Sequence, residues 1–213
     1  MLFHTDDGTG PAVVLVHGNG EDHTIFDKLI PVLSTNHRVV AVDLRGHGQS
    51  RPLDKGEALH YQDMADDVLE LMDELNLERP ALVGFSDGGI VGLLIASQHP
   101  DRLGKLVAMG ANSNPDGISG NVRRGMKIAW FFTRSPKLRL MLDEPHLSAD
   151  DLAKITVPTL LLAGSKDLIR ETDTRFLARS IPNAQLKIVD GEDHMSYVVH
   201  SEKLYPLIAG FLG

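Results

Sequence analysis

The stretch Ala81-Leu82-Val83-Gly84-Phe85-Ser86-Asp87-Gly88-Gly89 decides the fold that we expect for this chain. Its first five residues form a short apolar run, which is typical of a strand buried on both faces of a parallel sheet. The segment from Gly88 to His99 is nearly all apolar and ends before Pro100, as expected for a buried helix. Ser86 is therefore expected in a tight turn between a strand and a helix, with glycines on both sides that allow such a turn.

The same alternation of strand-like and helix-like segments extends along most of the chain. Further strand-like apolar runs occupy residues 12–16, 38–42, 106–109, 157–163 and 185–189. Amphipathic helices are expected over 60–77 and 197–211, where apolar residues recur at steps of three and four. This order predicts an α/β protein with a doubly wound, mostly parallel sheet that is covered by helices on both faces.

Residues 112–153 interrupt this pattern. A loop of that length without structure is improbable in a compact domain, so we predict a short helical cap insertion within a core made of residues 1–111 and 154–213. Six Lys or Arg residues and no acid lie between 121 and 142, although the chain has a net charge of −8. An amphipathic cap helix with a solvated basic face, a collar for anionic substrates and a membrane-touching patch all fit. Trp130 and Phe131 are candidate pocket-lining residues, because a lid presents apolar surface to an acyl group.

The composition excludes several classes of protein. A net charge of −8 argues against a nucleic-acid-binding protein, which needs a basic surface. With no cysteine, the chain has no disulfide, thiolate nucleophile or thiolate metal site. The N-terminal residues lack the pattern of a signal peptide, and no apolar run approaches the ~18 residues that span a bilayer. We therefore expect a cytoplasmic protein.

The motif around Ser86 indicates nucleophilic catalysis. A serine hydroxyl needs a base that removes its proton and an acid that orients the base. In a parallel sheet such groups gather at the carboxyl ends of strands, and Asp167 and His194 each directly follow a predicted strand. The chain order Ser86, Asp167, His194 is the order expected for this architecture, so we assign them as nucleophile, acid and base.

The sequence offers other acids and histidines near these strand ends. Asp116 follows an earlier strand and is an alternative acid, whereas Asp193, next to the base, is expected to point into solvent. His17 belongs to a turn in which a structural role is expected. His200 is expected within the last helix, where it faces solvent or packs.

Hydrolysis through a tetrahedral intermediate also requires two backbone N–H donors for its oxyanion. One should come from Asp87, which follows the nucleophile. The other should come from the loop 17–20, most simply from Asn19, with Gly20 as the alternative.

Five motifs in this order resemble the α/β-hydrolase superfamily from Ala12 onward. They are His17-Gly18, the turn Asp43 to Ser50, the elbow Gly84 to Gly89, Gly164 to Asp167, and Gly191 to His194. The resemblance implies the fold, a covalent acyl-enzyme and the triad Ser86, His194 and Asp167. In the turn 43–50 we expect a structural role, with substrate contact by Arg45 or His47 as the alternative.

Within this superfamily the chain is similar to small bacterial serine esterases. Haloalkane dehalogenases and epoxide hydrolases carry aspartate at the elbow, so Ser86 counts against both. The region before Ala12 is too short for the usual first two or three antiparallel strands, so we expect the sheet to be trimmed at that edge.

We therefore expect hydrolysis of a carboxylic ester with a small or medium acyl group, without a cofactor. Hydrolysis of amides, lactones, thioesters or carbon–carbon bonds, and perhydrolysis, use the same triad and remain alternatives. A non-catalytic ligand receptor is the alternative from a different class.

Overall fold

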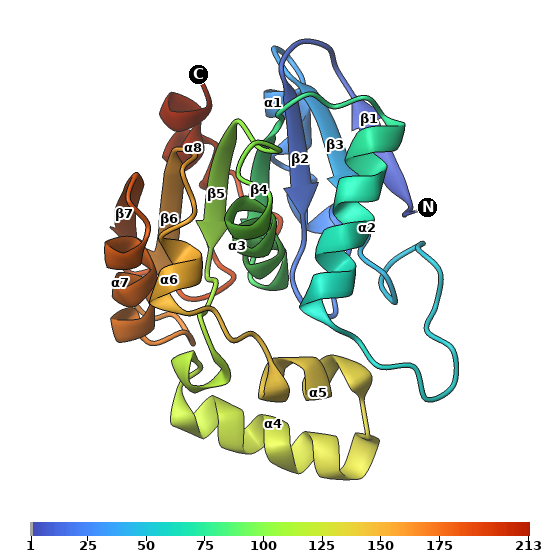
Figure 1. Cartoon of the computed structure of the whole chain (residues 1–213), viewed down its shortest axis with the longest axis vertical. Helices are drawn as coiled ribbons and strands as arrows, with labels where there is room; N and C mark the ends of the chain where they lie inside the picture. Colours follow the sequence, from blue (N-terminus) through green and yellow to red (C-terminus); the bar gives the residue numbers. More distant parts are fainter. Residues whose placement is uncertain (1) are drawn as a thin grey trace.

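The computed structural model describes residues 2–213, which form one seven-stranded sheet in the order β1-β3-β2-β4-β5-β6-β7 (Figure 1). The strands are β1 (His4–Asp7), β2 (Ala12–Val16), β3 (Arg38–Val42), β4 (Ala81–Phe85), β5 (Lys105–Met109), β6 (Thr159–Gly164) and β7 (Ala184–Val189). All neighbouring strands are parallel except β1, which runs antiparallel to β3 at the sheet edge. This topology confirms the predicted doubly wound, mostly parallel α/β architecture.

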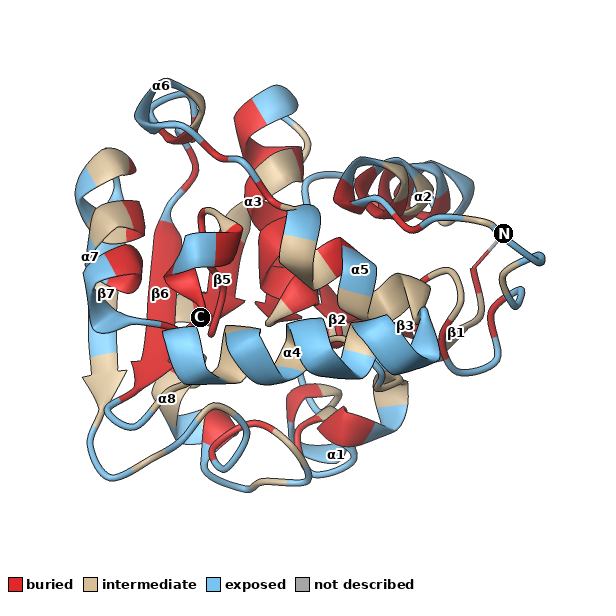
Figure 2. Cartoon of the chain, turned by 90° about the horizontal axis from the view of Figure 1, so that it is seen from below, coloured by how far each residue is buried: buried red, intermediate tan, exposed pale blue. Residues whose placement is uncertain are grey.

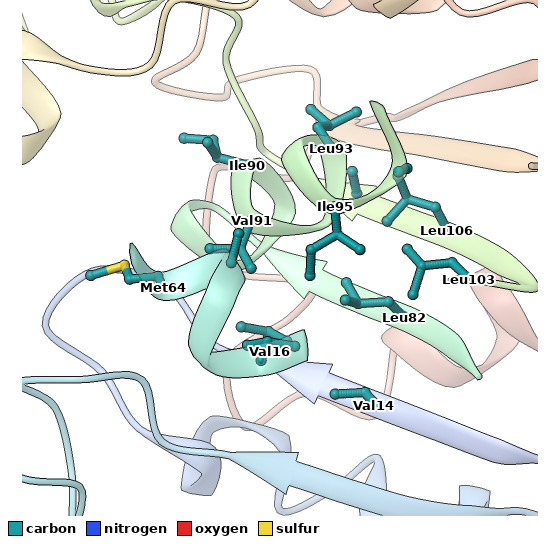
Figure 3. Close-up of a cluster of buried hydrophobic side chains, with 14 of the residues drawn as sticks. Val14, Val16, Met64, Leu82, Ile90, Val91, Leu93, Ile95, Leu103 and Leu106 are labelled. Atoms are coloured by element: carbon teal, nitrogen blue, oxygen red, sulfur yellow. The ribbon is translucent and has the colours of Figure 1, made fainter. Parts of the chain in front are cut away.

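Helices cover both faces of the sheet because successive strand residues point to opposite sides. Val14 and Val16 of β2 pack on one side, together with apolar residues of α2 (Tyr61–Glu74) and α3 (Asp87–Gln98), as Figure 3 shows. Val13 and Leu15 pack on the other side, against residues of η1 (His23–Phe26), α1 (Ile30–Leu33) and α8 (Leu204–Leu212). The apolar strands are thus buried on both faces, as a parallel sheet requires.

The strand order reverses between β2 and β4. From β2 the chain moves to β3 on one side and then returns to place β4 on the other side of β2. Val16 at the end of β2 pairs with Gly84 near the end of β4. The loops that leave these two strands therefore lie beside one another, and this topological switch point is where open α/β sheets bind their ligands.

Four helices lie between β5 and β6: η2 (Pro115–Gly117), α4 (Gly120–Thr133), α5 (Pro136–Asp143) and α6 (Ala149–Leu152). Helices α4 and α5 lie beyond the carboxyl ends of the strands (Figure 1). No residue of α4 is buried, and its outer surface is mostly exposed (Figure 2). No helix among residues 2–213 is long and apolar enough to cross a membrane.

Glu144, directly after α5, attaches this segment to the rest of the protein. Its carboxylate accepts a hydrogen bond from the N–H of Tyr61 (3.0 Å), the first residue of α2, and pairs with His60 (2.6 Å). A carboxylate at a helix N-terminus satisfies an N–H group that has no partner within the helix, and it is stabilised by the helix dipole. The remaining helix, α7 (Glu171–Ser180), covers β6 and β7.

The last helix begins later than the sequence predicted. Instead of starting at residue 197, α8 starts at Leu204, and His200 has a φ of 50° in the turn that precedes it. A residue in the left-handed region cannot continue a right-handed helix. Pro206, which has no N–H, is tolerated only in the first turn, so it marks a helix that begins shortly before it. The prediction that His200 lies inside this helix is therefore wrong.

Candidate active site

Ser86 occupies a strained turn between β4 and α3. Its backbone has φ 51° and ψ −112°, and its N–H donates to the carbonyl oxygen of Met109 (2.7 Å). A Cβ at Gly84 would overlap the carbonyl oxygen of Gly88, and a Cβ at Gly88 would overlap that of Val16. Neither glycine therefore leaves room for a side chain. The turn holds the Ser86 hydroxyl at the carboxyl edge of the sheet, at the N-terminal end of a helix.

A hydrogen-bonded chain connects Ser86 with His194 and Asp167. The Oγ of Ser86 is 3.1 Å from Nε2 of His194, and Nδ1 of His194 is 2.7 Å from Oδ1 of Asp167. The Asp167 side chain is only 2% exposed and also accepts the N–H groups of Ile169 (2.9 Å) and Gly164 (3.3 Å). The three residues come from the loops after β4, β6 and β7, and together they have the geometry of a nucleophile, a base and an orienting acid.

The two alternative acids, Asp116 and Asp193, are exposed, and neither carboxylate contacts the ring of His194. Asp116 is exposed and pairs with Arg123 on α4. Asp193 is exposed and accepts the N–H groups of the second and third residues after it, each at 2.9 Å. Among residues 2–213, only Asp167 forms a carboxylate contact with the ring of His194.

The loops that carry Asn19 and Asp87 are joined through their side chains. Nδ2 of Asn19 donates to Oδ2 of Asp87 (2.8 Å) and to the carbonyl oxygen of Lys137 on α5 (3.3 Å). Within residues 2–213, the backbone N–H groups of Asn19 and Asp87 donate to no protein acceptor. Two unpaired N–H groups therefore flank Ser86, one in the loop after β2 and one at the start of α3.

The side chain of Asp87 is almost completely buried, with 2% exposure. The hydroxyl of Tyr61 donates to its Oδ1 (2.7 Å), so both carboxyl oxygens have a donor. Burial raises the pKa of Asp87, and the hydrogen bonds from Tyr61 and Asn19 oppose that shift. Asp87 thus connects the loop after β2, the start of α2 and the start of α3.

His17 holds the loop after β2 in place. Its ring is fully buried, with Nδ1 2.7 Å from the carbonyl oxygen of Gly18, while Nε2 lies 3.0 Å from the N–H of Leu44 and accepts its hydrogen bond. Burial lowers the pKa of His17 and favours the neutral ring that this pattern requires. These contacts fit the structural role expected for His17.

The turn 43–50 is fixed by internal contacts. Buried Asp43 accepts the N–H of Gln49 (2.8 Å), and Arg45 pairs with Asp67 on α2 (2.5 Å). His47 is buried, its Nδ1 lies 2.9 Å from the carbonyl oxygen of Arg45, and burial lowers its pKa to about 4. Neither Arg45 nor His47 lines the cavity at Ser86.

One group within residues 2–213 has the spacing of cation ligands, namely Asp22, His23 and Asp43. Asp43 accepts hydrogen bonds from the backbone and the ring of His23 (2.8 Å each), and Asp22 accepts from Thr24 at the start of η1. These contacts account for the acids as parts of the two turns.

A cavity of about 240 Å³ opens at Ser86. Its apolar lining consists of Phe85, Ile118, Met126, Met141, Leu168, Ile169 and Met195, and its polar lining of Asn19, Glu21, Tyr61, Ser86, Asp87, Asn112 and His194. Met126 comes from α4 and Met141 from α5. Within residues 2–213, no basic side chain of the segment 121–142 lines this cavity, so the basic residues do not form a collar around it.

Trp130 and Phe131 lie elsewhere. Trp130 lines a separate cavity of about 580 Å³, whose wall also includes residues between 53 and 60 and residues of α5. The guanidinium groups of Arg134 and Arg139 lie 4.7 and 4.9 Å from the centre of the Trp130 ring. Phe131 is 60% exposed. The structure does not bring either aromatic residue to the Ser86 cavity.

Two polar residues of the cavity had no signal in the sequence. Tyr61 fits the apolar stripe of α2, so its hydroxyl contact with Asp87 could not be read from periodicity. Glu21 follows the turn of the loop after β2, where nothing in the spacing marks it as facing Ser86. These two groups are brought together by tertiary packing of α2 and the loop after β2, which no local sequence pattern shows.

A serine at a strand–helix elbow, followed in the chain by an aspartate and a histidine at later strand ends, defines a serine-hydrolase-like site on a doubly wound sheet. A family model described as the alpha/beta hydrolase fold matches residues 11–139. The chain belongs to the α/β-hydrolase family, and its general activity is that of a hydrolase.

Two curated relatives and one solved structure illustrate the similarity. The chain is 26% identical to 3-oxoadipate enol-lactonase 1 of Acinetobacter baylyi, over 95% of this chain and 88% of that protein. It is 27% identical to 2-hydroxymuconate semialdehyde hydrolase of Pseudomonas sp. (strain CF600), over 97% and 88%. A thermophilic esterase from Thermogutta terrifontis superposes with a TM-score of 0.81 at 25% identity, covering 99% of this chain and 92% of that structure. The names of these proteins refer to different substrates, so the similarity supports a hydrolase without selecting its substrate.

Proposed function

We propose that the protein hydrolyses carboxylic esters with small acyl groups, using Ser86 as the nucleophile. The observation that carries this proposal is the continuous chain from Ser86 Oγ through His194 to buried Asp167, with bond lengths of 3.1 and 2.7 Å. A non-catalytic receptor would have no need of this alignment, because each of the three groups serves proton transfer from serine.

Each step follows from this geometry. His194 Nε2 takes the hydroxyl proton while Oγ of Ser86 attacks the ester carbonyl carbon. The N–H groups of Asn19 and Asp87 bind the resulting oxyanion, and His194 returns the proton to the departing alcohol as the C–O bond breaks. Water that is deprotonated by His194 then hydrolyses the acyl-enzyme and restores Ser86. Asp167 holds the ring in the required tautomer and stabilises its charged form.

The cavity favours a small acyl group. Its volume of about 240 Å³ is below the roughly 300–1,000 Å³ that is usual for drug-sized ligands. Its apolar wall includes Met126 and Met141, whose flexible thioether side chains can adjust to short acyl chains of different shape. We propose that residues 112–153 act as a short cap that supplies this wall.

A lactone is the second candidate substrate, because a cyclic ester passes through the same tetrahedral intermediate. The similarity to an enol-lactonase over 95% of the chain favours including lactones in the test.

The proposal can be tested by labelling with a fluorophosphonate probe and by an ester panel. We expect wild type to be labelled and Ser86→Ala not to be, and p-nitrophenyl acetate and butyrate to be hydrolysed faster than the octanoate. A five-membered lactone is assayed alongside. Equal labelling of wild type and Ser86→Ala, or no labelling of either, would refute Ser86 as the nucleophile.

A further inference from the structure

Glu21 places a carboxylate beside the nucleophile that the proposed reaction does not use. Glu21 lies in the loop after β2 and lines the same cavity as Ser86 and His194. Its Oε2 accepts the N–H of Gly18 (3.1 Å), which fixes the carboxylate against the loop that carries Asn19.

The position of Gly18 sets an upper limit on the distance from this carboxylate to Ser86. A Cβ at Gly18 would lie 2.7 Å from Oε2 of Glu21 and 3.1 Å from Cβ of Ser86. The two atoms are therefore no more than about 6 Å apart. At this separation a charge on the substrate, near its reacting carbonyl, would interact directly with Glu21.

Among the described residues, no lysine or arginine in the cavity wall balances Glu21. Within residues 2–213, the other ionisable side chains of the wall are Tyr61, Asp87 and His194. The ammonium of Lys137 on α5 is half-buried and interacts with Asp87, but Lys137 does not line the cavity. Burial raises the pKa of Glu21; the hydrogen bond from the N–H of Gly18 and the nearby ring of His194 oppose this shift, and Asp87 and Asp22 add smaller effects in the raising direction.

Resting on the proposed ester hydrolysis, we propose that Glu21 is a specificity-determining residue that makes the site reject esters carrying a carboxylate and accept neutral or cationic ones. A negative group held near Ser86 would meet Glu21 in a partly desolvated cavity, where like charges repel more strongly than in water. An ammonium group would be attracted to Glu21 and could also lie against the aromatic faces of Phe85 or Tyr61.

Two isosteric ester pairs test this charge selection at pH 8, by release of the alcohol. Monomethyl succinate against methyl levulinate places the charge in the acyl group, and acetylcholine against 3,3-dimethylbutyl acetate places it in the alcohol. The kcat/KM ratio within each pair is compared between wild type and Glu21→Gln, so differences in intrinsic reactivity cancel. Gln keeps an oxygen that can accept the N–H of Gly18, and Glu21→Ala is the second variant should the first not fold.

We expect Glu21→Gln to raise the succinate to levulinate ratio, or to lower the acetylcholine to dimethylbutyl acetate ratio, by about tenfold or more. Which pair responds identifies the side of the ester that faces Glu21. Glu202→Gln removes an equal charge from an exposed position and should leave both ratios at the wild-type value. Unchanged ratios for both pairs in Glu21→Gln would overturn the inference even if Ser86 is essential, whereas fluorophosphonate labelling that does not depend on Ser86 would refute the proposed function itself.

Discussion

Removing the hydroxyl of Tyr61 should destabilise the protein more than removing that of Tyr197. Both rings are buried, with exposures of 2% and 0%. The Tyr61 hydroxyl donates to buried Asp87 (2.7 Å), whereas the Tyr197 hydroxyl has no hydrogen-bond partner among residues 2–213. Tyr61→Phe and Tyr197→Phe therefore remove the same atom from similar surroundings and differ in whether a partner is lost.

The expected size follows from the charge on Asp87. A hydrogen bond to a charged group contributes about 1.5–3 kcal/mol, and we expect Tyr61→Phe to lose an amount in this range at neutral pH. Burial already raises the pKa of Asp87, and the Tyr61 hydroxyl lowers it. Loss of that hydroxyl raises the folded-state pKa of Asp87 further, so ionisation of Asp87 removes more stability from the variant as the pH rises. The difference from wild type should shrink as the pH falls towards the unfolded value of about 3.9, where Asp87 becomes protonated.

Urea unfolding of wild type and both variants at pH 4.5 and 7.5 measures these differences. Tyr197→Phe should change the free energy of unfolding by less than about 1 kcal/mol, because an unpartnered buried hydroxyl contributes little. Equal losses in the two variants, or a Tyr61→Phe effect that grows on acidification, would refute the assignment of the Tyr61–Asp87 hydrogen bond as the stabilising contact.

Three further outcomes are expected. Gly88→Ala should lower the free energy of unfolding by about 3 kcal/mol or more, since its Cβ would overlap the carbonyl oxygen of Val16; wild-type stability in urea would contradict this. Burial raises the pKa of Glu21 above its unfolded value of 4.5, so stability is lost as the pH rises through the folded pKa, and Glu21→Gln should unfold at higher urea than wild type at pH 8 but not below pH 4.5. Asp167→Asn should reduce turnover by about 10⁴-fold because His194 loses its orienting acid, and a loss below tenfold in an ester assay would exclude Asp167 from that role.

The fold could be predicted because its central strands are continuous apolar runs. Along a strand that is buried on both faces, apolar residues do not alternate with polar ones. Each such strand is therefore a continuous apolar run that differs from the amphipathic helices around it. The edge strand β1 (His4–Asp7) could not be found this way, because its four residues include three polar side chains besides histidine and it is only half-buried. Its place is fixed by pairing with β3, which is a tertiary contact rather than a local pattern.

The candidate triad could be located because the loops that follow parallel strands all lie at the carboxyl edge of the sheet. The rule gives the position of a residue along the chain but not the direction of a distant side chain. The apolar ring of Trp130 predicts a place at the pocket. In the structure that ring is in contact with the guanidinium groups of Arg134 and Arg139, and Met126, one helical turn earlier on α4, lines the cavity instead. Which face of α4 or α5 meets the core depends on how this segment is attached to the rest of the protein. One attachment is the hydrogen bond from the N–H of Tyr61, at the start of α2, to Glu144, which follows α5.

Two acids close to Ser86 are an unexpected arrangement, because negative charge develops on the substrate at this point. The structure limits their effect in different ways. Both carboxyl oxygens of Asp87 accept hydrogen bonds, from Tyr61 and Asn19, so its negative charge is stabilised by groups of the protein. Its backbone N–H has no protein acceptor among the described residues. Glu21 has a single backbone donor in Gly18 and faces the cavity, so its charge remains available to the substrate. In the proposed reaction, the N-terminus of α3 favours the oxyanion of every ester alike, whereas Glu21 interacts with any further charge on the substrate. Rate and charge selection can therefore be set by separate groups, and the ester pairs measure the second while Ser86 labelling measures the first.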